Sequence, residues 1–155
     1  MPREIDRFVD TKRTRDELLR QEVSLLDLAK SVTPQMFSDL AKQLDADLKK
    51  LLAAGEIVKV EMETDPRLDG YFTAILDGRY PTFFLRLEPD GGRQPIIHVT
   101  QSSQASPHGS STPKHSQIEI IAKGQGQYFY RIGGNDEIRE RAADVLIAPL
   151  LSVLR

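Results

Sequence analysis

The hydrophobic residues of this chain change their spacing at Ile57, and that change limits the folds open to it. Before Ile57 the apolar residues recur every three to four positions, which is the spacing of amphipathic helices. After it, Val58, Val60 and Met62 alternate with charged residues, which is the pattern of a half-exposed strand. This order of helices first and strands afterwards predicts an α+β fold.

Two helices are expected before the change in spacing. Thr14 opens a Thr-Arg-Asp-Glu capping box, which predicts a first helix over residues 14–31. Thr33 is expected to cap a second helix, with Pro34 in its first turn and Gly55 just past its end. Both segments carry a broad apolar face that must be buried.

Turn-forming residues divide the remainder into about six short strands and one helix. Asp77-Gly78 is a strong hairpin signal, and Gly124-Gln125-Gly126 is expected to join the last two strands. The acidic pair Asp136-Glu137 suits the first turn of a C-terminal helix, which Pro149 is expected to stop or kink. The expected organisation is one domain over 1–155, with a helical part at 14–55, an antiparallel sheet at 57–132, a C-terminal helix at 136–148 and an apolar tail.

A polar segment at 101–117 interrupts the expected sheet. Six of its residues are Ser, and it has two Pro, one Gly and no large apolar side chain. A long loop of this kind in a small domain is usually functional or disordered. The sequence leaves both alternatives open.

The charge is unevenly distributed along the chain. The net charge is −2, but residues 91–134 carry four Lys or Arg against one acidic residue and hold all three histidines. Because local charge decides where an anionic partner binds, this block is the candidate region for such a partner.

Most kinds of catalytic or metal site find no support in the residues. The chain has no Cys, which excludes disulfides, thiol catalysis and Cys-type zinc sites. A site built from His98, His108 and His115 is geometrically conceivable, but no second shell that would hold these ligands is evident. The Ser-rich segment near the histidines is no evidence for a Ser/His/Asp triad, since any such loop supplies those residues. We expect no metal and no cofactor.

One nuclease-like pair remains as the enzymatic alternative. Glu119 and Lys123 would project from one face of an expected strand, as the carboxylate and lysine of metal-dependent nucleases do. Their separation is four residues rather than two, and no upstream Asp is identifiable. The expected function is therefore non-catalytic.

The strand at 127–132 is the richest in aromatic residues. Tyr128 and Tyr130 should share one face, with Phe129 and Arg131 on the other. Aromatics at this spacing are more often sheet core than stacking surfaces for bases, and the guanidinium of Arg131 is the feature that argues for the second alternative.

The segment 96–141 resembles the second half of the Schlafen AlbA-2 domain, a nucleic-acid-binding family. The motifs are the strand Ile96-Ile97-His98-Val99, Ser103, the pair Pro107-His108, and the strand Tyr128-Phe129-Tyr130-Arg131 followed by Gly133-Gly134-Asn135. The resemblance implies binding of DNA or RNA, with contacts from His108, Lys123 and Arg131. It does not extend to the first half of the chain, where no Glu-x-Lys signature occurs, so it implies no catalysis. Residues 24–63 also have the rough pattern of a winged helix.

Two functions follow as hypotheses. The first is a non-catalytic nucleic-acid-binding or regulatory domain, with contacts from Arg93, His108, Lys114, Lys123, Tyr128, Tyr130 and Arg131. The alternative is a protein–protein interaction module or chaperone-like adaptor that docks or forms homo-oligomers through its apolar C-terminal segment, with Leu146, Leu150, Leu151 and Leu154 at the interface.

No membrane partner is expected. The longest apolar run, at 145–154, is about half of the roughly 20 residues that a membrane helix needs. The N-terminus has no apolar segment behind a basic start, so we expect no secretory signal. We expect a cytoplasmic location.

Overall fold

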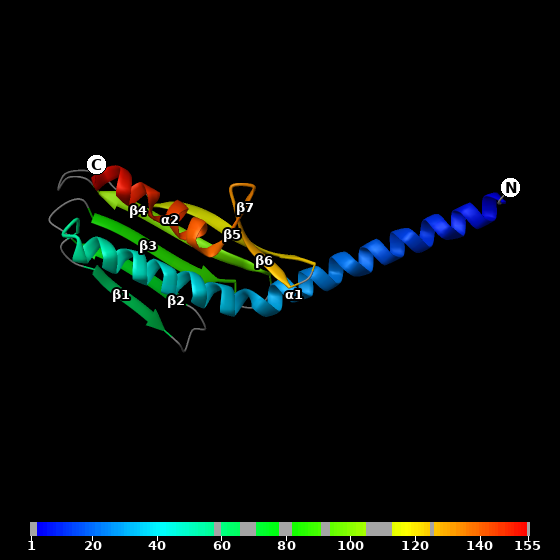
Figure 1. Cartoon of the computed structure of the whole chain (residues 1–155), viewed down its shortest axis with the longest axis horizontal. Helices are drawn as coiled ribbons and strands as arrows, with labels where there is room; N and C mark the ends of the chain where they lie inside the picture. Colours follow the sequence, from blue (N-terminus) through cyan, green and yellow to red (C-terminus); the bar gives the residue numbers. More distant parts are fainter. Residues whose placement is uncertain are drawn as a thin grey trace.

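The protein has two layers, an antiparallel sheet and a pair of helices that cover one of its faces (Figure 1). The computed structural model describes residues 3–57, 60–65, 71–77, 82–90, 94–104, 113–124 and 126–154. In chain order its elements are α1 (Glu4–Ala53), β1 (Val60–Asp65), β2 (Tyr71–Asp77), β3 (Thr82–Pro89), β4 (Ile96–Gln104), β5 (Lys114–Lys123), β6 (Gln127–Ile132), β7 (Asn135–Glu137) and α2 (Arg139–Leu154). The predicted α+β class is confirmed.

The expected pair of N-terminal helices is one continuous helix, so that prediction is wrong. Thr33 does not cap a second helix, because its hydroxyl donates to the Ala29 carbonyl at 2.7 Å inside α1. Pro34 likewise lies within the helix, and Thr14 donates to the Asp10 carbonyl at 3.0 Å instead of opening a capping box. The buried face runs through this region without a change of phase, and its packing outweighs the local stop signals.

The C-terminal end of α1 is as expected. Gly55 has φ +77°, which a residue with a side chain rarely adopts. Its amide donates to the Leu52 carbonyl at 3.1 Å, and the Glu56 amide donates to the Leu51 carbonyl at 3.0 Å. These two bonds form a Schellman motif, which satisfies the last helical carbonyls.

The strands of the described residues form a meander of seven, in the order β1 to β7, with every neighbouring pair antiparallel. The expected number was about six, and the additional strand is β7. The Asn135–Glu137 segment pairs with β6 instead of opening the C-terminal helix, and its Asp136 lies opposite Arg131.

The ends of the expected loop at 101–117 belong to strands. β4 continues to Gln104 and β5 begins at Lys114, and Thr100 lies opposite His115 in their pairing. Polar residues are tolerated there because most of them are exposed or lie on the sheet face that the helices do not cover. Gln101 lies on the covered face, and its side chain donates to the Leu146 carbonyl at 3.0 Å. Residues 105–112 lie outside the described residues.

The C-terminal helix differs from the expected 136–148. α2 begins at Arg139 and passes through Pro149 to Leu154. Pro149 has no amide hydrogen to donate to the helix, and this side of α2 faces solvent, since both Pro149 and Val145, one turn earlier, are exposed. Water can therefore hydrate the carbonyl that loses its helical donor.

The core lies between the helices and one face of the sheet. Fully buried side chains come from both layers: Leu40, Leu44 and Leu48 of α1, Phe83, Leu85 and Leu87 of β3, Ile97 of β4, Ile118 and Ile120 of β5, and Leu150 of α2. No helix among the described residues is long and apolar enough to cross a membrane.

Candidate functional site

The first half of α1 projects beyond the sheet (Figure 1). Every residue from Arg3 to Leu28 is exposed except Leu25, which is half-buried, and Ala29 is the first buried residue of the helix. A helix of 50 residues is about 75 Å long, so roughly half of that length has no layer packed on it.

An apolar stripe on the projecting half continues the buried face of α1. Eighteen residues make five turns, so residues 18 apart lie on one line along the helix. Phe8 and Leu26 are on the line of buried Leu44. Leu19 is on the line of Phe37, and Ile5 and Val23 are on the line of Ala41. We call Ile5, Phe8, Leu19, Val23 and Leu26 the apolar stripe.

The apolar stripe presents large side chains to solvent. Phe8 is 68% exposed and Leu26 is 46% exposed, although Leu44, on the same line, is 0% exposed. Single exposed apolar residues are common, whereas several that continue the line of a buried face form a candidate interaction surface, here divided by Lys12 and Arg15 between Phe8 and Leu19.

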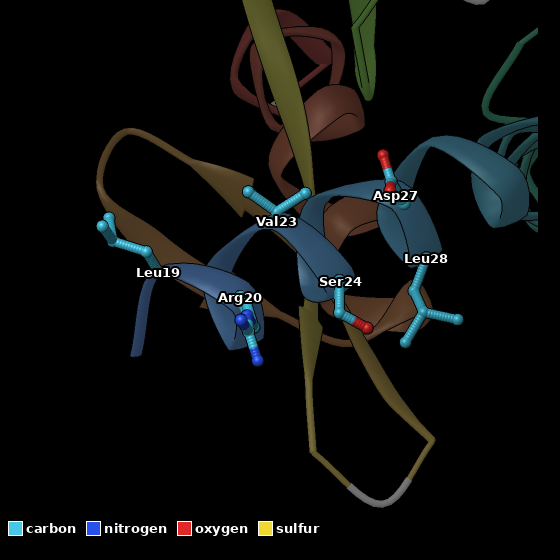
Figure 2. Close-up of a pocket in the computed structure, with 6 residues that line it drawn as sticks. All are labelled: Leu19, Arg20, Val23, Ser24, Asp27 and Leu28. Carbon is cyan, nitrogen blue, oxygen red and sulfur yellow. The ribbon is translucent and has the colours of Figure 1, made fainter. Parts of the chain in front are cut away.

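The surface of α1 is hollowed at two places near the stripe. Leu19 and Val23 border a shallow hollow with Arg20, Ser24, Asp27 and Leu28 (Figure 2), where the apolar side chains project from the ribbon. A second hollow of about 600 Å³ lies where α1 meets β5, and we call it the α1–β5 groove. It is bordered by Leu25, Leu26 and Ala29 on the helix and by Ile96, Ile120 and Ala122 on the sheet.

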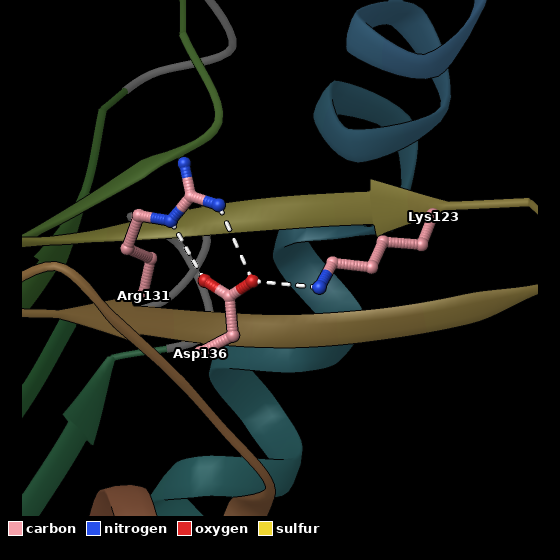
Figure 3. A network of polar contacts seen from close by, with 3 residues as sticks. All are labelled: Lys123, Arg131 and Asp136. Carbon is pink, nitrogen blue, oxygen red and sulfur yellow. Dashed lines mark hydrogen bonds and ion pairs between the residues drawn. The ribbon is translucent and has the colours of Figure 1, made fainter.

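The candidate nucleic-acid residues Lys123 and Arg131 meet at a carboxylate. Asp136 accepts from Arg131 Nε at 2.7 Å and pairs with Lys123 Nζ at 2.9 Å (Figure 3). Arg131 lies across from Asp136 and Glu119 in the strand pairing. Lys123 Nζ also lies 4.9 Å from the Phe129 ring centroid, within range of a cation–π contact.

These ion pairs stabilise the charged form of Asp136. The hydrogen bond from Arg131, followed by that from Lys123, lowers the pKa of the Asp136 carboxyl to about 2. The same pair raises the pKa of the Arg131 guanidinium. With Glu119 beside them, the two cations are balanced by two carboxylates, so this part of the outer sheet face has no net positive charge.

The remaining predicted contacts do not join that cluster. Lys114 and Lys123 are at opposite ends of β5, roughly 30 Å apart. Arg93 and His108 lie outside the described residues. Within the described residues, the basic block therefore does not form one cationic face.

The aromatic residues of β6 belong mainly to the core. Tyr130 is 2% exposed, and its hydroxyl donates to the Met36 carbonyl of α1 at 2.6 Å. Tyr128 is half-buried on the same face. Burial of Tyr130 raises the pKa of its phenol, with a smaller contribution from Asp39. A buried ring cannot stack on a base, which favours the core alternative for Tyr130.

The predicted interface residues of the C-terminal segment also pack on their own chain. Leu146 and Leu150 are buried in the core, and Leu151 is half-buried against it. The side chain of Leu154 lies outside the described residues. The apolar segment is thereby largely covered without a partner.

The histidines have local roles where they are described. His98 Nε2 lies 3.1 Å from Asp90 Oδ1, and His115 Nδ1 lies 3.3 Å from Thr100 Oγ1. No cluster of three potential metal ligands occurs among the described residues.

The apolar stripe was not among the predicted site residues. The spacing of five helical turns between Phe8, Leu26 and Leu44 is a signal present in the sequence. It becomes visible only when residues 4–53 are treated as one helix, because a start at Thr14 leaves Ile5 and Phe8 outside.

Comparison with models of protein families, with curated proteins and with solved structures finds no match to this chain.

Proposed function

We propose that this protein is a non-catalytic protein–protein interaction module that docks a helix of its partner on the apolar stripe of α1. The observation that carries the proposal is the continuity of the stripe with the buried face of the same helix. The apolar stripe lies on the same side of α1 as the residues that bury the helix against the sheet, and Lys12 and Arg15 interrupt it between Phe8 and Leu19. A second layer over the projecting half would complete the burial that the sheet provides for the rest.

The docking segment of this proposal is α1 rather than the C-terminal segment. Leu146 and Leu150 already contribute to the core of their own chain, whereas Phe8 and Leu26 are exposed. An interaction through the apolar stripe leaves the folded core intact, and an interaction through Leu146 and Leu150 would need the core to open. The projecting half of α1 can therefore bind a partner with the smallest change in the folded structure.

Site-specific photo-cross-linking in cells that express the full chain tests the docking face. A benzophenone amino acid at position 8 or 19 is expected to form covalent adducts with a partner. The same probe at position 17 or 21 serves as the control, because these positions are on the polar side of α1, and Glu17 is on the line of exposed Gln35. Equal adduct yields from the two sides of the helix would refute the proposal.

Nucleic-acid binding by residues 91–134 is a second proposal, supported by the cluster of exposed Lys123 with half-buried Arg131 and the half-buried Phe129 ring. Phosphate would have to compete with Asp136 for the two cations. Asp136→Asn is therefore expected to tighten binding of a labelled 20-nucleotide single strand roughly tenfold and to steepen its salt dependence. Glu140→Gln, which removes a carboxylate on α2, is the control. Absence of salt-dependent binding at micromolar protein in both variants and in the unmodified chain would rule this proposal out.

A further inference from the structure

We infer that the partner of the apolar stripe is a second copy of this chain, and that the two α1 helices pack antiparallel. The inference rests on the proposed docking function and adds the identity of the partner and its direction. Three features carry it: the charges that interrupt the stripe, the groove at its inner end and the accessible surface of one copy.

The charges within the stripe select the antiparallel direction. Lys12 and Arg15 lie on the side of α1 that carries the stripe, in the gap between Phe8 and Leu19. A parallel pair in register would place each of these cations opposite its own copy, and like charges in a helix seam repel. Reversal of one helix removes that repulsion.

One antiparallel register satisfies both the apolar and the charged residues. If Phe8 of one copy is level with Leu26 of the other, the twofold axis lies at residue 17 and Lys12 is level with Glu22 of the second copy. Arg15 is then three residues from the level of the same Glu22, which is less than one helical turn. Both cations of each helix come within reach of one carboxylate of the other.

The same register places the tip of each helix at the α1–β5 groove of the other copy. Ile5 comes level with Ala29 and Phe8 with Leu26, and both of these residues border the groove. Its sheet side includes apolar Ile96, Ile120 and Ala122, with Gln94 and Glu119 beside them. The groove, of about 600 Å³, thus offers apolar contacts for the two side chains at the end of the stripe.

The exposed area of a single copy is large enough for such a pair. The chain has an accessible surface of 10594 Å², whereas a compact monomer of 17.4 kDa is expected to have roughly 7,900 Å². The excess of one copy is larger than the roughly 800 Å² that each partner contributes to a standard protein interface. An overlap of residues 4–30 in both copies would be about 40 Å long.

The molar mass of the full chain, measured by light scattering after size exclusion, tests the identity of the partner. The unmodified chain is expected at twice the mass of one copy, and Leu26→Asp at the mass of one. Leu28→Asp is the matched control, because Leu28 is exposed to the same degree but is on the line of exposed Ala46, away from the stripe. It is expected to remain a dimer. A monomeric unmodified chain at 100 µM, or equal dissociation of both variants, would overturn the inference.

Engineered disulfides test the direction, on a chain that has no Cys of its own. Oxidation of Phe8→Cys mixed with Leu26→Cys is expected to give covalent dimers, and neither variant should give them alone. Covalent dimers from Phe8→Cys alone would show a parallel pair and overturn the antiparallel inference.

The two proposals fail in distinguishable ways. If the purified chain is a monomer and the adducts formed at position 8 contain a different protein, the docking function is retained and the self-pairing is refuted. An absence of adducts from the whole stripe would refute both.

Discussion

Leu44→Ala is expected to lower the free energy of unfolding by about 3 kcal/mol, whereas Leu26→Ala is expected to lower it by less than about 0.5 kcal/mol in dilute solution. The two leucines are on the same line of the same helix, five turns apart. They differ in burial, since Leu44 is fully buried and Leu26 is not. Truncation at Leu44 leaves a cavity between α1 and the sheet, and truncation at Leu26 leaves only a smaller exposed side chain.

Urea denaturation at about 1 µM and about 100 µM protein measures both variants and separates core from interface. The cost of Leu44→Ala should be similar at both concentrations because it acts within one chain. The cost of Leu26→Ala should grow with concentration, since association stabilises the folded state by mass action. A loss of several kcal/mol from Leu26→Ala at the lower concentration would mean that the projecting half is buried against its own chain.

Helices and hairpins with strong local patterns were predictable. Gly55 ended α1 as its turn chemistry required, and Tyr128 and Tyr130 shared one strand face as their alternation required. In these cases, residues close in sequence determine the geometry, and tertiary packing agrees with them.

The continuity of α1 was not predictable from local signals. Thr33 and Pro34 together resemble a helix start. The Thr33 hydroxyl donates to the Ala29 carbonyl instead, because the residues before it are already helical and bring that carbonyl within reach. Burial of residues on both sides of this point, such as Ala29 and Phe37, supplies the free energy that keeps the helix unbroken. That contribution comes from the sheet, more than 40 residues away in sequence for most of its strands.

The candidate polar site was predictable only in part, because pairing between strands also decides which residues meet there. The polar cluster of Lys123 and Arg131 was found from composition, but its neutralising partner Asp136 was expected in a helix. Once Asn135–Glu137 pairs with β6, Asp136 stands opposite Arg131 and binds it. A net charge counted along the chain therefore overstated the positive potential of this surface.

Replacement of Tyr130 by Ala is expected to lower the free energy of unfolding by about 4 kcal/mol, because it removes a buried ring and detaches β6 from α1. Tyr130→Phe keeps the ring and loses only the hydrogen bond to the Met36 carbonyl, so a loss of about 1 kcal/mol is expected. Chemical denaturation at neutral pH measures both, and equal losses from Ala and Phe would show that the hydroxyl alone connects the two layers.

The phenol of Tyr130 also gives stability an alkaline limit. Its pKa is raised in the folded state above the usual 10.0, so the folded chain retains a proton that the unfolded chain releases. The resulting contribution is complete below pH 10 and falls as the pH rises above it. Tyr130→Phe should therefore lose less stability than the unmodified chain between pH 10 and 11.5, while Tyr128→Phe controls for the loss of a tyrosine hydroxyl from the same strand. Parallel pH profiles for the unmodified chain and Tyr130→Phe would contradict the burial of the hydroxyl against α1.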